Sequence, residues 1–477
     1  MLLYNTLGRE LQKFVPIEMG KVGFYGCGPT VYNYAHIGNL RAYVTHDILM
    51  RTLRARGFDV QHVMNITDVG HLTGDNDEGD DKMLKSAEER GKSVLEIADS
   101  YTKAFFADTD RLNIIRPTVI CKATEHIGDM IALIKRIETN GYTYSKGGNL
   151  YFDTAKFADY GKLALLRPDE QKTGSRVEAD NNKRNPRDFA LWFTKSKYEN
   201  QALVWDSPWG RGYPGWHIEC SAMSMKYLGE QFDIHAGGID HISIHHTNEI
   251  AQSEAGTGKN PWVKYWVHNE FLVLDRVKMS KSAGGFLTLQ TLVDRGYDPL
   301  DYRYFLLSAH YRSQLQFSFE ALDGARNARR SLCDRVRTLL KKEEKANNAR
   351  ADAAASYLEE FNAAMDSDLS TPRALAELFG LLKDAEKGEI AADTALTAVF
   401  RMDEILGLNI KQGIEKDETR SDVDAVEIKA IEERIAERAA AKKTKDFAKA
   451  DAIRAALKEK GILLEDMPDG TIWKKLI

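Results

Sequence analysis

A strand–helix–strand unit near the N-terminus places the strongest restriction on the fold. Residues 21–29, KVGFYGCGP, end in a glycine–proline turn and predict a strand. A helix is expected next, because the apolar residues Leu40, Val44 and Ile48 recur every four positions. Residues 59–67, DVQHVMNIT, predict a second strand. Two strands joined through a helix run parallel, so the unit predicts an α/β fold built on a parallel sheet.

The tetrapeptide His36-Ile37-Gly38-Asn39 lies where this helix is expected to begin. Gly38 lets a ligand approach the backbone, and the start of a helix favours phosphate. The His36 imidazole can donate a hydrogen bond to phosphate oxygens as their charge shifts. By itself, however, a histidine at a helix start is more often an ordinary surface residue, so both interpretations stay open at this point.

A second stretch, residues 215–254, gathers side chains that bind metal ions. It contains Cys220 and the sequence HHTNE, in which His245 and Glu249 would project from one face of a helix. Thiolate, imidazole and carboxylate are zinc ligands, and an incomplete protein shell leaves a position for substrate. Spacing alone does not choose between His245 and His246. It is equally compatible with a buried cysteine and exposed polar residues on a helix.

Composition limits the class of protein. A length of 477 residues, with 43% hydrophobic and 29% charged residues, is typical of a globular protein of about three domains. The sequence predicts no membrane span and no signal peptide. Four widely spaced cysteines argue against a disulfide scaffold and for a cytoplasmic location: Cys27, Cys121, Cys220 and Cys333. Because the net charge is −5, an RNA partner would have to meet local basic patches.

Several motifs, taken together, resemble one family over nearly the whole chain. These are CGPTVY followed by HIGN, GWHIECS, HAGGID, HHTNEIAQSE, and KMSKS at residues 278–282. They are similar to the motifs of the cysteinyl-tRNA synthetases, a family of class I aminoacyl-tRNA synthetases. The chain departs from the family pattern in four places: Asn39 stands for a second histidine, Ala236 for a glycine, Ser243-Ile244 for Phe-Pro, and Gly285 for an asparagine.

The resemblance implies a set of site residues. The metal ligands fall on Cys27, Cys220, His245 and Glu249, with one zinc ion per chain. The catalytic residues fall on His36, Lys278 and Lys281. The ATP contacts, with Mg²⁺ accompanying ATP, fall on His36, Gly38, Asn39, Asp240 and Lys281. Thr67 and Trp216 would line the amino-acid pocket. Asp240 also follows a predicted strand, where a carboxylate suits a ribose hydroxyl, although it fits a simple turn nearly as well.

The resemblance also implies a domain order. A Rossmann-like parallel-sheet catalytic domain occupies 1–118 and 204–265, and a connective insertion at 119–203 divides it. Next comes a KMSKS-bearing region at 266–315 that contacts the acceptor stem. An α-helical bundle at 316–410 and a small C-terminal anticodon-binding domain at 420–477 complete the order. An acidic linker is expected at 411–425. In the last domain, Arg434, Arg438 and Lys442 recur every four residues, and Trp473 offers a base-stacking surface.

The function implied by the resemblance is ATP-dependent ligation of L-cysteine to tRNA(Cys) through a cysteinyl-adenylate, by a monomer. Three alternatives stay open. The first is a related ligase that forms a cysteine amide on an amino sugar, which would need no C-terminal domain. The second is a noncatalytic tRNA-binding relative, against which the intact HIGN and KMSKS motifs argue. The third is a zinc hydrolase, which only the ligand set suggests.

Overall fold

The computed structural model describes residues 1–69, 86, 90, 92–165, 182–195, 203–274, 286–341, 351–444, 446–459, 462–467 and 470–475. They form two compact units, residues 1–409 and 410–477. Within the described ranges, every helix is too short or too polar to cross a membrane.

A five-stranded parallel sheet forms the centre of the first unit. Its strand order is β11-β10-β3-β4-β5, with bounds β3 Lys21–Gly26, β4 Asp59–Ile66, β5 Val119–Lys122, β10 Phe232–Gly238 and β11 Val263–Asn269. The predicted parallel strand–helix–strand unit is therefore confirmed. The chain passes from β3 to β4 on one side and later returns to β10 on the other. Ligands of open α/β sheets bind beyond the carboxyl ends of strands at such a reversal.

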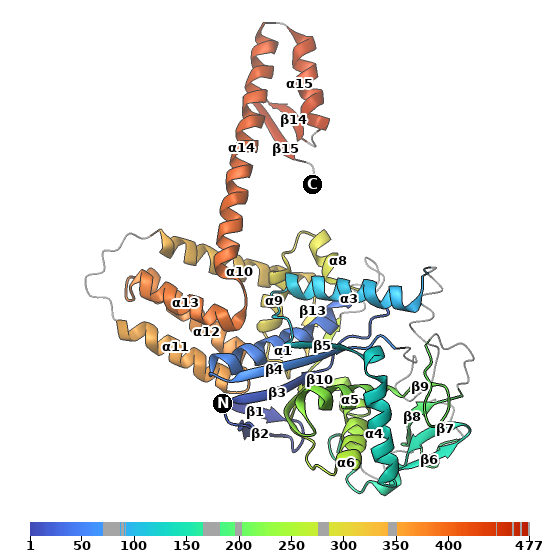
Figure 1. Ribbon diagram of the computed structural model, residues 1–477. Helices are drawn as coiled ribbons and strands as arrows, with labels where there is room; N and C mark the ends of the chain where they lie inside the picture. The colour runs from blue at the N-terminus through green and yellow to red at the C-terminus, as the bar shows by residue number, and fades with distance from the viewer. Residues whose placement is uncertain are drawn as a thin grey trace. The chain divides into compact units, whose positions relative to one another are not determined.

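Helices cover both faces of this sheet (Figure 1). On one face lies α1 (Ile37–Ala55), where the stripe of Leu40, Val44 and Ile48 is buried as predicted. The α3 helix (Val94–Arg111) packs beside α1 through the rings of Tyr43 and Phe105, whose centroids are 4.7 Å apart. On the other face, α5 (Trp216–Leu228) packs with α4 (Ile127–Thr139) and α6 (His245–Thr257). The sheet therefore has the two-sided cover typical of a Rossmann-like domain.

The strands between residues 143 and 214 form a separate antiparallel sheet. Its strand order is β6-β7-β8-β9, with bounds β6 Thr143–Lys146, β7 Asn149–Phe152, β8 Phe189–Phe193 and β9 Tyr213–Pro214. The sequence placed the start of the insertion at residue 119, but β5 hydrogen-bonds to β4 in the central sheet. The end placed at residue 203 likewise precedes β9. Strand pairing with distant segments, which a local pattern does not reveal, moves both boundaries.

Short elements connect the catalytic sheet to the helices that follow it. They are β1 (Leu2–Asn5) and β2 (Glu10–Lys13), which pair antiparallel; β12 (Leu272–Leu274) and β13 (Leu315–Phe317), which pair parallel; and the helices α8 (Leu289–Asp294) and α9 (Pro299–Leu307). Three 3₁₀ turns complete the described elements of this unit: η1 (Ala123–Glu125), η2 (Thr154–Lys156) and η4 (Ile239–His241).

A helical bundle ends the first unit. Its helices are α10 (Phe319–Leu340), α11 (Ala351–Asp366), α12 (Thr371–Glu386) and α13 (Ala392–Leu406). The buried guanidinium of Arg303 in α9 joins this bundle to α1. It donates to Asp47 Oδ2 of α1 at 2.6 Å and to the carbonyl of Leu406 at the end of α13 at 2.7 Å. Because a buried charge is costly unless it is paired, this contact holds the bundle against the catalytic domain.

The second unit contains α14 (Ile410–Lys443), α15 (Phe447–Glu459) and a hairpin of β14 (Ile462–Met467) and β15 (Gly470–Lys475). The acidic linker expected at 411–425 is instead part of α14. Its glutamate, lysine and alanine residues are good helix formers, and it contains no proline. The expected basic stripe is not uniformly exposed, since Arg438 is only 2% exposed. Arg434 forms an ion pair with Glu437 at 2.6 Å.

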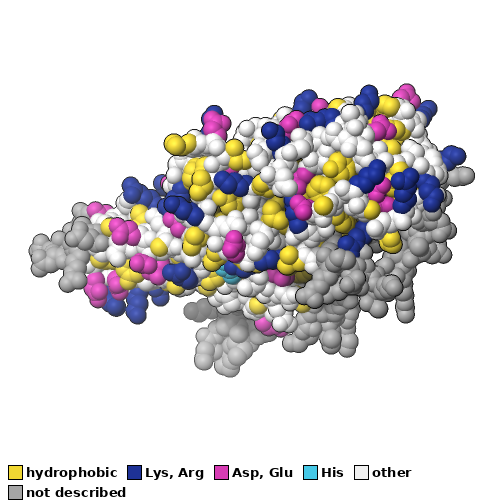
Figure 2. Space-filling view, turned by 90° about the horizontal axis from the view of Figure 1, so that it is seen from below, with side chains coloured by type: hydrophobic (Ala, Val, Ile, Leu, Met, Phe, Trp, Pro, Cys, Tyr) yellow, Lys and Arg dark blue, Asp and Glu magenta, His cyan; other side chains and the backbone are white. Residues whose placement is uncertain are grey.

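Charged side chains of both signs are intermixed on the face seen in Figure 2. Local ion pairs are common on the described surface, such as Lys103 with Asp99 at 2.7 Å and Lys387 with Asp384 at 3.1 Å. This mixture agrees with the net charge of −5. Attraction for a nucleic acid would therefore have to come from particular cations and not from the net charge.

Candidate active site

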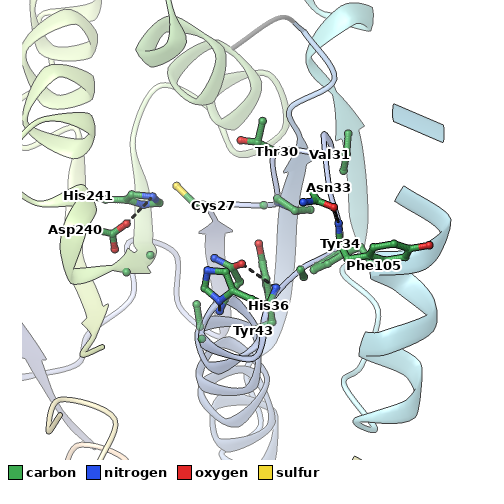
Figure 3. A pocket seen from close by; sticks show the side chains of 18 of the residues that line it. Cys27, Thr30, Val31, Asn33, Tyr34, His36, Tyr43, Phe105, Asp240 and His241 are labelled. Atoms are coloured by element: carbon green, nitrogen blue, oxygen red, sulfur yellow. Dashed lines mark hydrogen bonds and ion pairs between the residues drawn. The ribbon is translucent and has the colours of Figure 1, made fainter. Parts of the chain in front are cut away.

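A cavity of about 530 Å³ opens at the carboxyl ends of β3 and β10, where the strand order reverses. Its walls come from the segment after β3, the first turns of α1, two residues of α3 and one of α5, the end of β10 with the segment after it, residues 269–272, and Phe286. In Figure 3, Cys27 lies between Asp240 and His241 on one side and Tyr34 and Phe105 on the other. Distant parts of the chain therefore meet at the edge of the sheet that is typical of ligand binding in this architecture.

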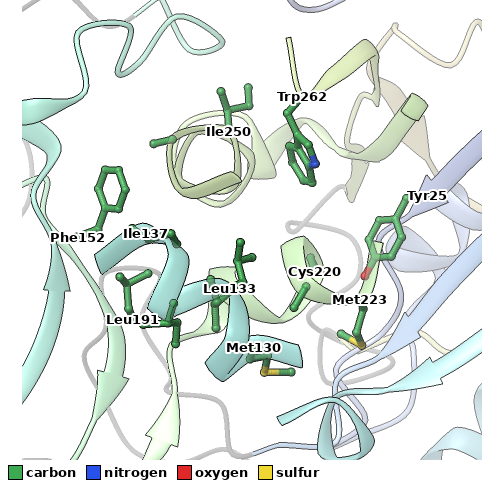
Figure 4. Packing of buried hydrophobic residues seen from close by; sticks show 14 of the residues in the cluster. Tyr25, Met130, Leu133, Ile137, Phe152, Leu191, Cys220, Met223, Ile250 and Trp262 are labelled. Carbon is green, nitrogen blue, oxygen red and sulfur yellow. The ribbon is translucent and has the colours of Figure 1, made fainter. Parts of the chain in front are cut away.

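The structure brings the four predicted metal ligands together beside this cavity. One ligand atom from each of Cys27, Cys220, His245 and Glu249 lies within 4.8 Å of the others, and all four residues are buried. Cys27 follows β3, Cys220 lies on α5, and the remaining two are one turn apart on α6. Figure 4 shows Cys220 among the packed apolar side chains that surround α5. Rigid elements therefore hold the cluster on three sides.

A second set of possible ligands overlaps the first. Cys27 and Glu249 also meet His235 and His246 within 4.8 Å. In this set, one nitrogen of His235 and both nitrogens of His246 already have polar contacts, whereas His235 Nδ1 has none. His235 Nε2 contacts Glu249 Oε2 at 3.0 Å, while His246 contacts His268 Nε2 through Nδ1 at 2.8 Å and Cys27 Sγ through Nε2 at 3.3 Å. These histidines therefore support the ligands better than they replace them.

The first set has the geometry of atoms that face a common ion. Glu249 Oε1 is buried and has no hydrogen-bond partner, although it lies 2.9 Å from His245 Nε2. The two atoms approach each other without the alignment of a hydrogen bond, as two ligands of one cation would. His245 Nδ1 contacts His217 Nδ1 at 3.1 Å, which leaves Nε2 for the cluster. The donor set of two sulfurs, one imidazole and one carboxylate suits zinc.

The electrostatics of the cluster also suit a divalent cation. A hydrogen bond from the Cys27 thiol lowers the pKa of Cys220 to about 6 against the effect of burial. Burial alone would raise the pKa of Glu249, but His235 and His245 lower it to about 2. Burial opposes the charged form of His245, yet Glu249 and Cys220 raise its pKa to about 10. The lowered pKa values of Cys220 and Glu249 favour the thiolate and the carboxylate, which are the forms that bind a metal ion.

A group of histidines surrounds the cluster, and the sequence reasoning had considered only one of them, His246, as a possible ligand. It consists of His217, His235, His241, His246 and His268. The sequence could have pointed to His217, because it lies three residues before Cys220 and therefore on the same helix face. The others come from β10, η4, α6 and β11, so only tertiary structure unites them. His268 in turn contacts Thr6 Oγ1 at 2.7 Å, which extends the hydrogen-bonded chain away from Cys27.

At the start of α1, the predicted phosphate residues form a capping box. His36 is the N-cap: its Nδ1 accepts from Asn39 N at 3.1 Å, and its own N donates to Asn39 Oδ1 at 3.2 Å. With Nδ1 as an acceptor, the neutral ring carries its proton on Nε2. Burial lowers the pKa of His36, so the neutral ring prevails at neutral pH. A Cβ at Gly38 would lie 3.0 Å from the His36 ring, which explains the glycine.

Of the remaining predicted residues, some line the cavity, one is buried behind its wall, and others lie outside the described residues. Asp240 and Trp216 line the cavity, and the Trp216 ring lies 4.2 Å from the ring of His245. Thr67 is buried behind the wall of the cavity, where its backbone bonds to Pro29 and Val31 and its hydroxyl accepts from Asn65 at 3.0 Å. The predicted residues Lys278 and Lys281, together with Gly285, lie outside the described residues. The departure at Ala236 is a buried position within β10.

The parallel sheet, the histidine-capped helix after its first strand and the cavity at the reversal point define the catalytic domain of a class I aminoacyl-tRNA synthetase. Residues 13–327 match the family of tRNA synthetases class I (C) catalytic domains, and residues 360–411 match the DALR domain. The predicted family and fold class are confirmed.

Comparison with individual proteins shows which family of class I synthetases the chain belongs to. The chain is 58% identical over 494 residues to the cysteine–tRNA ligase of Treponema denticola, with 99% of each chain covered. It is 48% identical over 473 residues to cysteine–tRNA ligase 1 of Burkholderia lata, with 98% and 96% covered. The methionyl-tRNA synthetase of Mycobacterium tuberculosis in complex with methionyl-adenylate shares the fold, at a TM-score of 0.57 and 16% identity over 82% of this chain and 90% of that one. This chain belongs to the cysteine–tRNA ligase family.

Proposed function

We propose that this chain activates L-cysteine with ATP and transfers the cysteinyl group to tRNA(Cys). The observation that carries the proposal is the buried cluster of Cys27, Cys220, His245 and Glu249, which adjoins a cavity bordered by His36 and Asp240. One side of the cavity thus suits a thiol and the other suits a nucleotide. We further propose zinc as the metal of the cluster, Mg²⁺ as the companion of ATP, and a cytoplasmic monomer as the working form.

Selection of cysteine depends on the cluster. Zinc supplies a soft Lewis acid that favours a substrate thiolate over the hydroxyl of serine. Cys27, Cys220, His245 and Glu249 would hold the zinc, which would supply the affinity for the substrate sulfur. His217 and His235 hold His245 and Glu249 in orientation through hydrogen bonds. Trp216 covers His245 on the cavity side and would exclude water from the bound amino acid.

Adenylate formation depends on the other side of the cavity. The cysteine carboxylate attacks the α-phosphate of ATP, and pyrophosphate leaves. His36 Nε2–H and the start of α1 would donate to the phosphates, with Gly38 permitting close approach and Asn39 fixing the His36 ring. Asp240 would accept from the ribose hydroxyls. Lys278 and Lys281 are proposed to balance the charge that develops on the leaving pyrophosphate.

Transfer to tRNA completes the reaction. A hydroxyl oxygen of the terminal adenosine bonds to the carbonyl carbon of the adenylate, the bond from that carbon to the phosphate oxygen breaks, and AMP leaves with the electron pair. The hydroxyl proton passes to the departing phosphate. We propose that residues 420–477 bind the anticodon, with support from the basic residues of α14 and from Trp473.

The test is exchange of labelled pyrophosphate into ATP, with zinc analysis and tRNA charging on the same preparation. L-Serine is the matched control for L-cysteine, since it differs in one atom. We expect exchange with cysteine to exceed exchange with serine by about 10⁴-fold, because a site built for one polar group rejects its analogue on that scale. One zinc per chain and charging of tRNA(Cys) are expected as well.

Other results would identify the alternatives. A folded, zinc-bearing protein without cysteine-dependent exchange would contradict the proposal. Hydrolysis of a model ester without ATP would indicate a zinc hydrolase. Exchange with cysteine, followed by transfer to an amino sugar in preference to tRNA, would indicate the related ligase.

A further inference from the structure

Three aromatic side chains line the cavity. Two of them, Tyr34 and Phe105, lie on the side of Cys27 away from Asp240 (Figure 3). We call Tyr34, Tyr101 and Phe105 the aromatic bay. Tyr101 and Phe105 come from α3 and are 6% and 3% exposed, whereas Tyr34, from the segment after β3, is 54% exposed. The Tyr34 and Tyr101 rings meet edge to face at 4.9 Å. Two rings are therefore fixed by packing, and a third presents its surface to the cavity.

A cation lies at the rim of this bay. The Arg90 guanidinium carbon lies 5.5 Å from the centroid of the Tyr101 ring. Arg90 also donates to the Ser86 hydroxyl at 2.7 Å, and that hydroxyl donates to the carbonyl of Tyr32 at 2.8 Å. These contacts direct a positive charge toward the bay while Arg90 stays exposed. Aromatic rings next to an arginine are the combination that binds a nucleobase with its phosphate.

The substrates of the first step do not account for the bay. Cysteine is expected at the ligand cluster, and ATP is expected between the start of α1 and Asp240. In Figure 3, Asp240 lies on the far side of Cys27 from Tyr34 and Phe105. The second step needs another nucleoside, whose hydroxyl must reach the carbonyl of the adenylate while AMP still occupies its own position. That nucleoside must therefore enter from a different side of the same cavity.

We propose that the aromatic bay binds the 3′-terminal adenosine of tRNA, with its base against Tyr34 and Tyr101 and its 5′-phosphate near Arg90. This assignment rests on the proposed function, because it names the place of the second substrate in that reaction. Stacking suits an adenine, which presents a large π-face. A position beside Cys27 brings the attached ribose close to the activated carbonyl carbon. The bay thus positions the nucleophile and takes no part in adenylate formation.

The experiment compares two forms of tRNA(Cys), one intact and one lacking the terminal adenosine. Binding to the full-length, zinc-bearing chain is measured by competition against a fluorescent tRNA. We expect the parent chain to bind intact tRNA roughly tenfold more tightly than the shortened form, the size of one stacked base. Tyr34→Ala should reduce this ratio to about one, and Tyr34→Phe should restore it. Retention of the full ratio in Tyr34→Ala overturns the proposal.

Two further variants sharpen the result. Leu95→Ala is the matched control, because Leu95 is 53% exposed on α3 and does not line the cavity. It should keep the parental ratio, and a loss as large as that of Tyr34→Ala would overturn the specific role of the bay. Arg90→Gln should weaken binding of intact tRNA and reduce the slope of its salt dependence by about 0.7, the value for one phosphate of a single strand. An unchanged slope removes Arg90 from the assignment.

Pyrophosphate exchange distinguishes failure of this proposal from failure of the proposed function. If the parent chain shows no cysteine-dependent exchange, the proposed function fails, whatever the tRNA binding shows. If exchange is present and Tyr34→Ala raises the KM for ATP while keeping the ratio between the two tRNAs, the bay belongs to the adenine of ATP and the proposal fails alone. A lower rate of transfer from preformed adenylate in Tyr34→Ala supports it.

Discussion

The two sides of the cavity are built in different ways. The metal-ligand cluster is buried, and its four members come from three elements separated by up to 222 positions in the chain, from Cys27 to Glu249. The phosphate side is exposed, and its central contact joins His36 to Asn39, three residues apart. The cluster therefore depends on tertiary packing, whereas the phosphate side depends largely on the local geometry of one helix start.

Physical chemistry explains this difference. Buried ionised groups are costly unless they are paired, so the thiolate and carboxylate of the cluster need the surrounding histidines. In return, a site without water can distinguish a thiol from a hydroxyl. The phosphate side must instead admit ATP and release pyrophosphate. A helix N-terminus serves there because its backbone N–H groups and dipole are present in any helix.

The largest effect is expected when a predicted metal ligand of the cluster is replaced. Cys220→Ser should release the metal, because a hydroxyl is a poor zinc ligand at neutral pH. Cysteine-dependent pyrophosphate exchange should fall by about 10⁴-fold together with the loss of zinc. Metal analysis and exchange on one preparation measure both. Cys333→Ser is the control, since Cys333 is buried in α10 outside the cluster and this variant should keep its zinc. Full zinc content with full activity in Cys220→Ser would exclude Cys220 as a ligand.

A smaller effect is expected on the phosphate side. Lys281→Ala should slow adenylate formation by about 10²- to 10³-fold, the usual loss for one donor to a developing negative charge. The affinity for cysteine should hardly change, because the proposed partner of Lys281 is phosphate and not sulfur. Single-turnover kinetics over a range of cysteine concentrations separates the two quantities. Lys281→Arg, which keeps the charge, should recover part of the rate. A parental rate in Lys281→Ala would remove this lysine from the mechanism.

The smallest effect concerns stability in acid and tests a buried histidine of the central sheet, His62 in β4. His62 stacks on Phe24 at 4.4 Å, two residues before the end of β3, and burial lowers its pKa to about 3. The unfolded chain, with an ordinary histidine pKa of about 6.5, binds this proton more readily. His62 therefore destabilises the fold as the pH falls below about 6.5 toward 3. One unit below 6.5, the cost is about 1.4 kcal/mol.

The measurement is urea unfolding of the parent and of His62→Gln at pH 7.5 and pH 5.5. The parent should lose about 1.4 kcal/mol more than the variant between these two values. Because each protein is compared with itself, the cost of the lost ring contact with Phe24 cancels. Equal losses would show that His62 takes up its proton in the folded state.

The sequence by itself determined the features that repeat over a few residues. The spacing of Leu40, Val44 and Ile48 predicted the buried face of α1, and HHTNE placed His245 and Glu249 one turn apart on a helix. Both predictions are confirmed because an α-helix relates residues four apart whatever surrounds it. The motifs in their order also predicted the family, which the comparisons confirm.

Only the tertiary structure decided how distant segments meet. Cys27 reaches the cluster because β3 pairs with β10, with Gly26 opposite Ala236. Both His245 and His246 lie in possible ligand sets with Cys27 and Glu249, so the choice that spacing left open stays a prediction. The same pairing rules put residues 119–122 in the central sheet, and packing put Thr67 behind the cavity wall. Such contacts join positions far apart in the chain, so no local periodicity can encode them.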